Sequence, residues 1–161
     1  MGVLYYDERL NRWMPLTQHL PSDEDELKKF IVSNPSIIPV KDIKEDISDF
    51  IFAVEELSLP NGDSIDIVAF NKEGNICLIE CKLGKNPEVR RKVVGQILEY
   101  AAYMWKLSYD ELDSRIKVKT GDDLVSNIKS YVGEEFDEEI FINNVRETLD
   151  NGSFLLMIVV D

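Results

Sequence analysis

Two short apolar runs, residues 66–70 and 76–82, carry charged side chains where a buried strand normally has none. Side chains alternate between the two faces of a strand, so Glu80 and Lys82 share one face of the second run. An unpaired buried charge is strongly destabilising, so such charges need a partner or a metal ion. Asp66 stands between two isoleucines on the first run, at the same end of the predicted hairpin. The three charged side chains are therefore expected to form one site.

Together with a glutamine in the following helix, these residues form a known pattern. The segments Ser64-Ile65-Asp66 and Glu80-Cys81-Lys82, followed by Gln96, resemble the signature of the PD-(D/E)XK nuclease superfamily, the fold of many restriction endonucleases and junction resolvases. An isoleucine stands where the name of the motif has proline. The resemblance covers about residues 23–96 and, more loosely, residues 144–161. It implies an α/β fold in which a central mixed β-sheet is flanked by α-helices around a restriction-endonuclease-like core.

The resemblance also implies a function, a metal-dependent nuclease that hydrolyses DNA phosphodiester bonds. Asp66 and Glu80 offer the hard oxygen ligands that Mg²⁺ prefers, with Mn²⁺ as a substitute, and the Cys81 backbone carbonyl is a further expected ligand. Lys82 is expected to orient or deprotonate the attacking water and to stabilise negative charge. Gln96 is expected to hold the water or a phosphate oxygen. The expected catalytic residues are Asp66, Glu80, Lys82 and Gln96.

A helix with an acidic first turn is predicted ahead of these strands. Ser22 or Asp23 caps it, and acids favour the positive end of a helix dipole. For any one of the four acids at residues 23–26, stabilising the start of the helix is the simpler explanation. In nucleases of this kind, however, a glutamate of the first helix often points at the metal. The spacing of Glu24 and Leu27 favours Glu24 over Glu26 as this additional ligand, bound directly or through water.

The net charge of −13 counts against nucleic-acid binding, because Lys and Arg contacts to phosphates supply its nonspecific affinity. The charge is unevenly distributed along the chain, which weakens this objection. Residues 82–92 carry five basic side chains and one acidic one, a local charge of +4 that leaves −17 for the rest of the chain. A solvated helix face explains these basic residues nearly as well. The expected DNA contacts are Lys85, Arg90, Arg91 and Lys92.

The remaining elements follow from apolar patterning and turn signals. Residues 3–6 and 12–14 predict an N-terminal hairpin, with Pro15 confining its second arm to a sheet edge. Residues 154–160 are entirely apolar, which predicts a strand buried on both faces and parallel to its neighbour. The other predicted elements are an antiparallel meander over 50–59, 66–70 and 76–82, and helices over 87–107, 122–131 and 134–149.

Composition excludes several classes of protein. No run approaches the roughly 20 apolar residues of a membrane span, and the N-terminus lacks signal-peptide features, so we expect a cytoplasmic protein without a membrane partner. Cys77 and Cys81 lie four residues apart on one strand, roughly 13 Å at about 3.3 Å per residue, too far to bridge each other. His19 is the only histidine, which excludes mechanisms that need a histidine pair.

We expect one domain over residues 1–161, with residues 1–20 as a hairpin extension at its edge. Because the chain stops just after an apolar strand, we expect it to be the N-terminal part of a longer protein with a further C-terminal domain or a protein partner. The alternative function is a non-catalytic DNA-processing or assembly module that retains the nuclease fold, which the acidic composition favours. Action on RNA is a third hypothesis. The sequence does not decide between endonuclease and exonuclease action, nor whether the protein is a homodimer.

Overall fold

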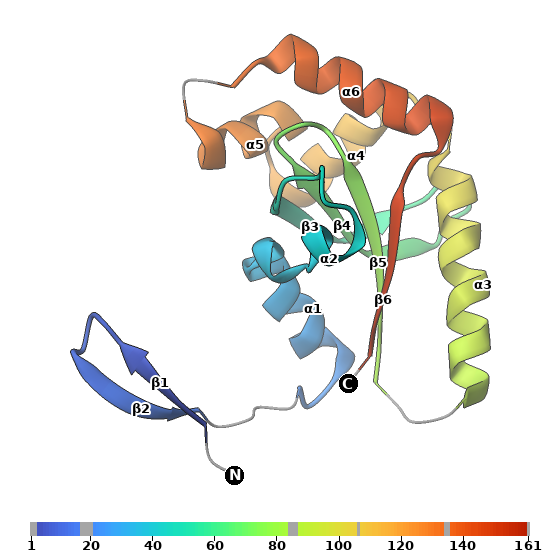
Figure 1. Cartoon of the computed structure of the whole chain (residues 1–161). Coiled ribbons are helices and arrows are strands. Elements are labelled where there is room, and N and C mark those ends of the chain that lie inside the picture. The colour runs from blue at the N-terminus through green and yellow to red at the C-terminus, as the bar shows by residue number, and fades with distance from the viewer. Residues whose placement is uncertain (1–2, 17–20, 84–86, 106, 134–135, 161) are drawn as a thin grey trace.

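The computed structural model describes residues 3–16, 21–83, 87–105, 107–133 and 136–160 (Figure 1). The strands are β1 (Val3–Asp7), β2 (Arg12–Leu16), β3 (Phe50–Ser58), β4 (Ser64–Asn71), β5 (Ile76–Lys82) and β6 (Leu155–Val160). The helices are α1 (Glu24–Ser33), α2 (Val40–Ile43), α3 (Pro87–Met104), α4 (Tyr109–Thr120), α5 (Leu124–Val132) and α6 (Glu138–Asn151), with a 3₁₀ turn at Pro35–Ile37.

A mixed sheet of four strands, in the order β3-β4-β5-β6, forms the centre of the fold. β3, β4 and β5 are antiparallel neighbours, whereas β6 runs parallel to β5. Short turns suffice for the antiparallel connections, but a parallel pairing needs a long crossover, and helices α3 to α6 supply it. The structure confirms the α/β class, the antiparallel meander and the parallel last strand.

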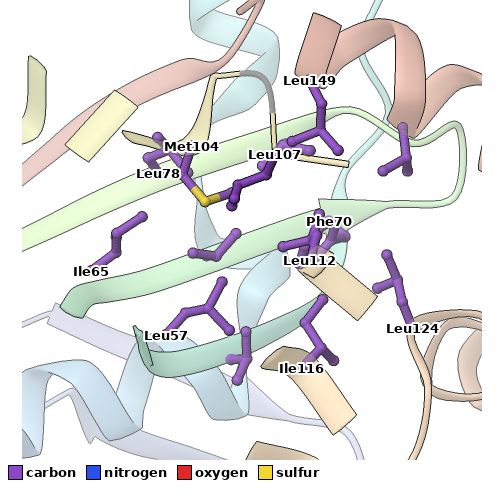
Figure 2. Packing of buried hydrophobic residues seen from close by; sticks show 14 of the residues in the cluster. Leu57, Ile65, Phe70, Leu78, Met104, Leu107, Leu112, Ile116, Leu124 and Leu149 are labelled. Carbon is purple, nitrogen blue, oxygen red and sulfur yellow. The ribbon is translucent and has the colours of Figure 1, made fainter. Parts of the chain in front are cut away.

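Apolar side chains fill both faces of this sheet. One core lies between the sheet and helices α3 to α6, where residues such as Leu78, Met104, Leu112 and Leu149 interlock (Figure 2). A second core lies on the opposite face, where α1 covers residues such as Ile67 and the two cysteines. Both cysteines are buried and free, as their spacing predicts.

Helix ends follow capping chemistry. Asp23 caps α1 by accepting a hydrogen bond from the Glu26 amide (2.8 Å). The predicted helices over 87–107, 122–131 and 134–149 correspond to α3, α5 and α6, each with shifted ends; α6 begins at its Asp137 cap. α4 is a helix that the sequence patterning did not predict. Its start is a capping box between Ser108 and Glu111. None of the described helices combines the length and apolar character that a membrane crossing requires.

The last strand corrects one prediction. β6 is an edge strand, and Leu156, Ile158 and Val160 on one of its faces are exposed. The prediction of burial on both faces was wrong because an apolar run shows that both faces can be covered, not that they are. Its other face packs on the α1 core.

The N-terminal hairpin is confirmed, and it forms a two-stranded sheet of its own. Figure 1 shows this hairpin standing away from the body of the molecule. Tyr6 and Trp13 face each other on it with ring centroids 5.4 Å apart, yet Trp13 remains 67% exposed. Pro15 is tolerated because both strands of a two-stranded sheet are edges.

Candidate active site

The site forms where β4 and β5 stop pairing. Their described ladder ends at Ile67 opposite Ile79, which places Asp66 across from Glu80 on the same face. Beyond this point, Asp66 Oδ2 accepts a hydrogen bond from the Cys81 amide at 2.8 Å. A side chain thus replaces the next backbone hydrogen bond, and the strands are held together while the two carboxylates remain side by side.

Glu80 is the most unusual residue of the site. It is 1% exposed, and neither of its carboxylate oxygens accepts a hydrogen bond among the described residues. Its Oε1 lies 3.2 Å from Lys82 Nζ, an ion-pair contact without hydrogen-bond geometry. Burial, followed by the charge of Asp66, raises the pKa of Glu80 from 4.5 to about 7, although Lys82 opposes the rise. The carboxylate is therefore costly to ionise in this place.

Lys82 lies between two glutamates. Its Nζ is 3.2 Å from Glu80 Oε1 and 3.3 Å from Glu24 Oε2. Desolvation is the largest single effect and lowers its pKa, but Glu80, Asp66 and Glu24 together outweigh desolvation and raise the pKa above its ordinary value. The sequence alone did not show whether desolvation or the neighbouring carboxylates dominate the pKa of Lys82. In this arrangement the ammonium stays charged at neutral pH and acts as a source of positive charge.

Glu24 reaches the site from the first turn of α1. Besides its contact with Lys82, its Oε1 accepts a hydrogen bond from the Leu83 amide at 3.2 Å. Glu26 instead turns back to the helix start, where it accepts hydrogen bonds from the amide (2.7 Å) and hydroxyl (2.9 Å) of Ser22. Glu26 thus serves the helix start, whereas Glu24 faces the site; its role as a metal ligand stays a prediction.

The described hydrogen bond of Gln96 stays within its own helix. Its Nε2 donates a hydrogen bond to the hydroxyl of Tyr100, one turn later on α3, at 2.7 Å. Burial raises the pKa of Tyr100, and the nearby charges of Glu80 and Asp66 add to the rise. Tyr100 therefore holds Gln96 by a hydrogen bond and lies within electrostatic range of the two carboxylates. Sequence reasoning assigned it only to the apolar stripe of the helix, although the four-residue spacing from Gln96 was a usable signal.

Lys28 is a second residue that sequence reasoning missed. It lies one turn after Glu24 and is buried, with its Nζ 2.8 Å from Asp25 and 3.0 Å from Glu56. The hydrogen bond that Lys28 donates to Asp25 is the main reason that the pKa of Lys28 rises above the ordinary value. The contact with Glu56 joins α1 to β3, so it holds the helix that presents Glu24.

The four expected DNA contacts are only partly described. Lys85 and the side chain of Arg90 lie outside the described residues. Arg91 and Lys92 are exposed on the early turns of α3. This helix follows Lys82 in the chain, so its basic start lies at the same end of the sheet as the carboxylates (Figure 1).

Within the described part of the chain, no group of three or more His, Cys, Asp or Glu side chains has the arrangement of a metal site. Asp66 and Glu80 nevertheless form a carboxylate pair in which Glu80 is buried and both of its oxygens lack a hydrogen-bond donor among the described residues. The Cys81 backbone carbonyl stays a predicted ligand. Neither family models, nor curated proteins, nor solved structures contain a match for this chain.

Proposed function

We propose that this chain is a metal-dependent nuclease that hydrolyses DNA phosphodiester bonds on a restriction-endonuclease-like core. The observation that carries the proposal is Glu80, a buried carboxylate without a hydrogen-bond donor, opposite a second carboxylate. This arrangement destabilises the fold, and neither core packing nor backbone pairing requires it. Buried acids with a raised pKa beside charged partners are typical of functional sites.

The donor set suits a hard divalent cation. Neither oxygen of Glu80 accepts a hydrogen bond, and Asp66 uses only Oδ2 for the Cys81 amide, which leaves acceptor positions on both carboxylates among the described residues. Asp66 and Glu80, with the Cys81 carbonyl, would hold Mg²⁺ or Mn²⁺ directly, and Glu24 would act through a water molecule bound to the metal. Few protein ligands and several waters fit magnesium better than zinc. Such a cation makes water nucleophilic and neutralises charge on phosphoryl oxygens.

The side chains of the protein then have distinct tasks. The Lys82 ammonium stabilises negative charge that develops on the phosphoryl group and orients the attacking water. Glu24 holds Lys82 in place across the end of the sheet at 3.3 Å. Gln96, fixed through its hydrogen bond to Tyr100, has an amide oxygen with which to accept a hydrogen bond from that water.

DNA is the favoured substrate, because the basic start of α3 lies beside the site in an otherwise acidic chain. Arg91 and Lys92 are placed to bind backbone phosphates. Because few cations face the nucleic acid and the remaining surface repels it, binding is expected to be weak, and each phosphate contact lowers the logarithm of the affinity by only about 0.9 per tenfold rise in salt.

The test is cleavage of single-stranded, nicked, branched and supercoiled DNA at low salt, with Mg²⁺, Mn²⁺ or EDTA. We expect metal-dependent cutting by the wild type. Glu80→Gln keeps the size of the side chain but removes its charge, and it is expected to lower the rate by about 10²-fold or more. Glu99→Gln removes an exposed acid from α3 and serves as the matched control, with an unchanged rate.

The outcome also tests the choice between the acids of α1. Glu24→Gln is expected to slow cleavage, whereas Glu26→Gln is expected to leave the rate constant intact and only weaken the helix start. Cutting that survives Glu80→Gln in a folded protein would contradict the assignment. If the wild type cuts nothing, calorimetric titration with Mn²⁺ decides the rest: binding lost in Glu80→Gln indicates an assembly module with a built metal site, and no binding refutes the metal site.

A further inference from the structure

The N-terminal hairpin of β1 and β2 exposes aromatic side chains instead of burying them. Residues paired across two strands share a face, as do residues two apart on one strand, so the register places four side chains together: Leu4, Tyr6, Trp13 and Pro15. All four are exposed, Trp13 by 67% and Leu4 by 60%. Among the described residues, none of the hairpin belongs to either hydrophobic core. We call these four side chains the aromatic face.

Local contacts hold the hairpin in shape while the aromatic face stays exposed. A two-stranded hairpin on its own is marginally stable in water, so it needs support from its turn. Asp7 Oδ1 accepts hydrogen bonds from the amides of Arg9 (2.9 Å) and Leu10 (3.0 Å). The Tyr6 hydroxyl donates a hydrogen bond to Asn11 Oδ1. A ligand therefore meets aromatic side chains that are already arranged, which lowers the entropic cost of binding.

The chain tethers the aromatic face near the candidate active site. Leu16 ends β2, and Glu24, which contacts Lys82 in the site, follows eight residues later. An extended chain spans at most about 3.6 Å per residue, so the end of the hairpin lies within about 29 Å of Glu24. A stacked nucleic-acid strand advances about 3.4 Å per nucleotide, so this reach corresponds to about eight nucleotides. Since α1 and α3 both begin at the same end of the sheet, one DNA strand can reach the hairpin and the site together (Figure 1).

From this chemistry and position, we propose that the aromatic face binds unpaired bases of single-stranded DNA close to the bond that is cut. The inference rests on the proposed function and deepens it, because it names a substrate with a single-stranded segment within about eight nucleotides of the site. Bases stack on the rings of Tyr6 and Trp13, a contact that tolerates any sequence because every base has a flat π face. Arg9, exposed in the turn, is placed to contact a phosphate of the same strand.

Unpaired bases fit this face better than a DNA duplex does. The bases of a duplex are already stacked on each other, and binding its outer row of phosphates needs an excess of cations. Residues 3–16 carry two acids and two arginines, a net charge of zero, so the hairpin has no such excess. In a chain of net charge −13, a neutral hairpin with exposed rings favours contact with bases over contact with phosphates.

A folded protein partner fits the face less well. A stable protein interface buries about 800 Å² on each partner and takes about 20–30 residues a side. The aromatic face consists of four side chains on a hairpin that spans only residues 3–16. So small a contact is sufficient for stacking, because each stacked base contributes about 5-fold to 150-fold to affinity.

Fluorescence anisotropy with labelled oligonucleotides tests the aromatic face. The whole chain is titrated at low salt in EDTA, which prevents cleavage, with a single strand and with the blunt duplex of the same sequence. We expect the single strand to bind tighter by about fivefold or more. Trp13→Ala is expected to weaken single-strand binding by about fivefold or more and to leave duplex binding unchanged. The matched control is Phe30→Ala, which removes a 58% exposed ring from α1 and is expected to change neither affinity.

Two further variants separate stacking from plain apolar contact. Trp13→Phe keeps a ring and is expected to retain single-strand affinity within about threefold, whereas Trp13→Leu keeps only an apolar side chain and is expected to lose about fivefold or more. Because Trp13 belongs to neither hydrophobic core, these variants keep the fold, which circular dichroism checks. Equal single-strand binding by Trp13→Leu and wild type overturns the proposal. A wild type that binds no single strand also overturns it and leaves the face to a protein partner.

Cleavage in Mg²⁺ distinguishes this proposal from the proposed function. The substrates are a blunt duplex and the same duplex with a single-stranded overhang. We expect Trp13→Ala to lower kcat/KM on the overhang substrate by about fivefold or more with kcat unchanged, because stacking binds the substrate away from the bond that is cut. A wild type that cuts both substrates with equal kcat/KM, unaffected by Trp13→Ala, overturns the role of the aromatic face while the nuclease assignment stands. A wild type that binds single strands through Trp13 but cuts nothing supports the aromatic face and counts against the nuclease assignment.

Discussion

Replacing Glu80 by glutamine should stabilise the metal-free protein, and the gain should depend on pH. The folded protein holds this carboxylate with a pKa near 7, against 4.5 ordinarily. At about 1.4 kcal/mol per pKa unit, the difference corresponds to about 3 kcal/mol. Because the folded-state pKa is raised, the unfolded chain releases this proton first. Stability therefore falls as pH rises from about 4.5, and the loss is complete above about 7.

The assay is urea unfolding in EDTA, with the free energy of unfolding measured for wild type and Glu80→Gln across that range. We expect the advantage of Glu80→Gln to be about 2.5 kcal/mol larger at about pH 8 than at about pH 5. Asp25 and Glu111, whose pKa values are lowered, contribute with the opposite sign at lower pH, but they contribute to both proteins and cancel in the difference.

Refutation is straightforward. A stability difference between the two proteins that does not change with pH would show that Glu80 ionises as easily in the fold as in water. Adding Mg²⁺ or Mn²⁺ at about pH 8 extends the assay, because a ligand that binds only the folded state raises its stability. We expect the metal to stabilise the wild type and not Glu80→Gln.

Two further predictions concern the scaffold. Gly74→Ala is expected to lower the free energy of unfolding by about 2 kcal/mol, because φ is +87° and the added Cβ would lie 3.0 Å from the Phe141 carbonyl oxygen. Gly62→Ala, at φ +93° with open space around it, is expected to lower it by about 1 kcal/mol, and equal losses would contradict this account. Ser108→Ala removes the capping box of α4 and is expected to lower the free energy of unfolding by about 1 kcal/mol, measured by urea unfolding. Ser114→Ala, inside the same helix, is the control and should cause no loss.

Alternation along strands made much of the sheet and site predictable. Once Glu80 and Lys82 were placed on an apolar strand, the period of two put them on one face, and a tight antiparallel connection put Asp66 opposite. The acidic start of α1 likewise suggested two positions for its glutamates, one at the helix start and one facing the site. Glu26 takes the first position and Glu24 the second. These are local rules, and they hold because a one-residue slip would move every apolar side chain to the wrong face.

Other features depend on what lies nearby in space. The apolar run of β6 has the same composition whether a strand lies in the middle or at the edge of a sheet, so its exposed face was not predictable. α4 buries only Leu112 and Ile116 among many charged residues, which makes a weak periodic signal, although the capping box before it was visible. Tyr100 counts as apolar in any periodic pattern, and its hydroxyl gains a role only because Gln96 lies one turn away.

The hydrogen bond from the Cys81 amide to Asp66 has a consequence for how this chain can evolve. Asp66 supports the backbone as well as the proposed metal site, so a descendant that had abandoned catalysis would still lose stability by replacing it. Glu80 accepts no such bond, and a neutral residue there would relieve the fold. Relatives that retain the aspartate therefore reveal little about activity. Drift at the position of Glu80, towards glutamine or leucine, would be the first mark of a lineage that no longer cuts.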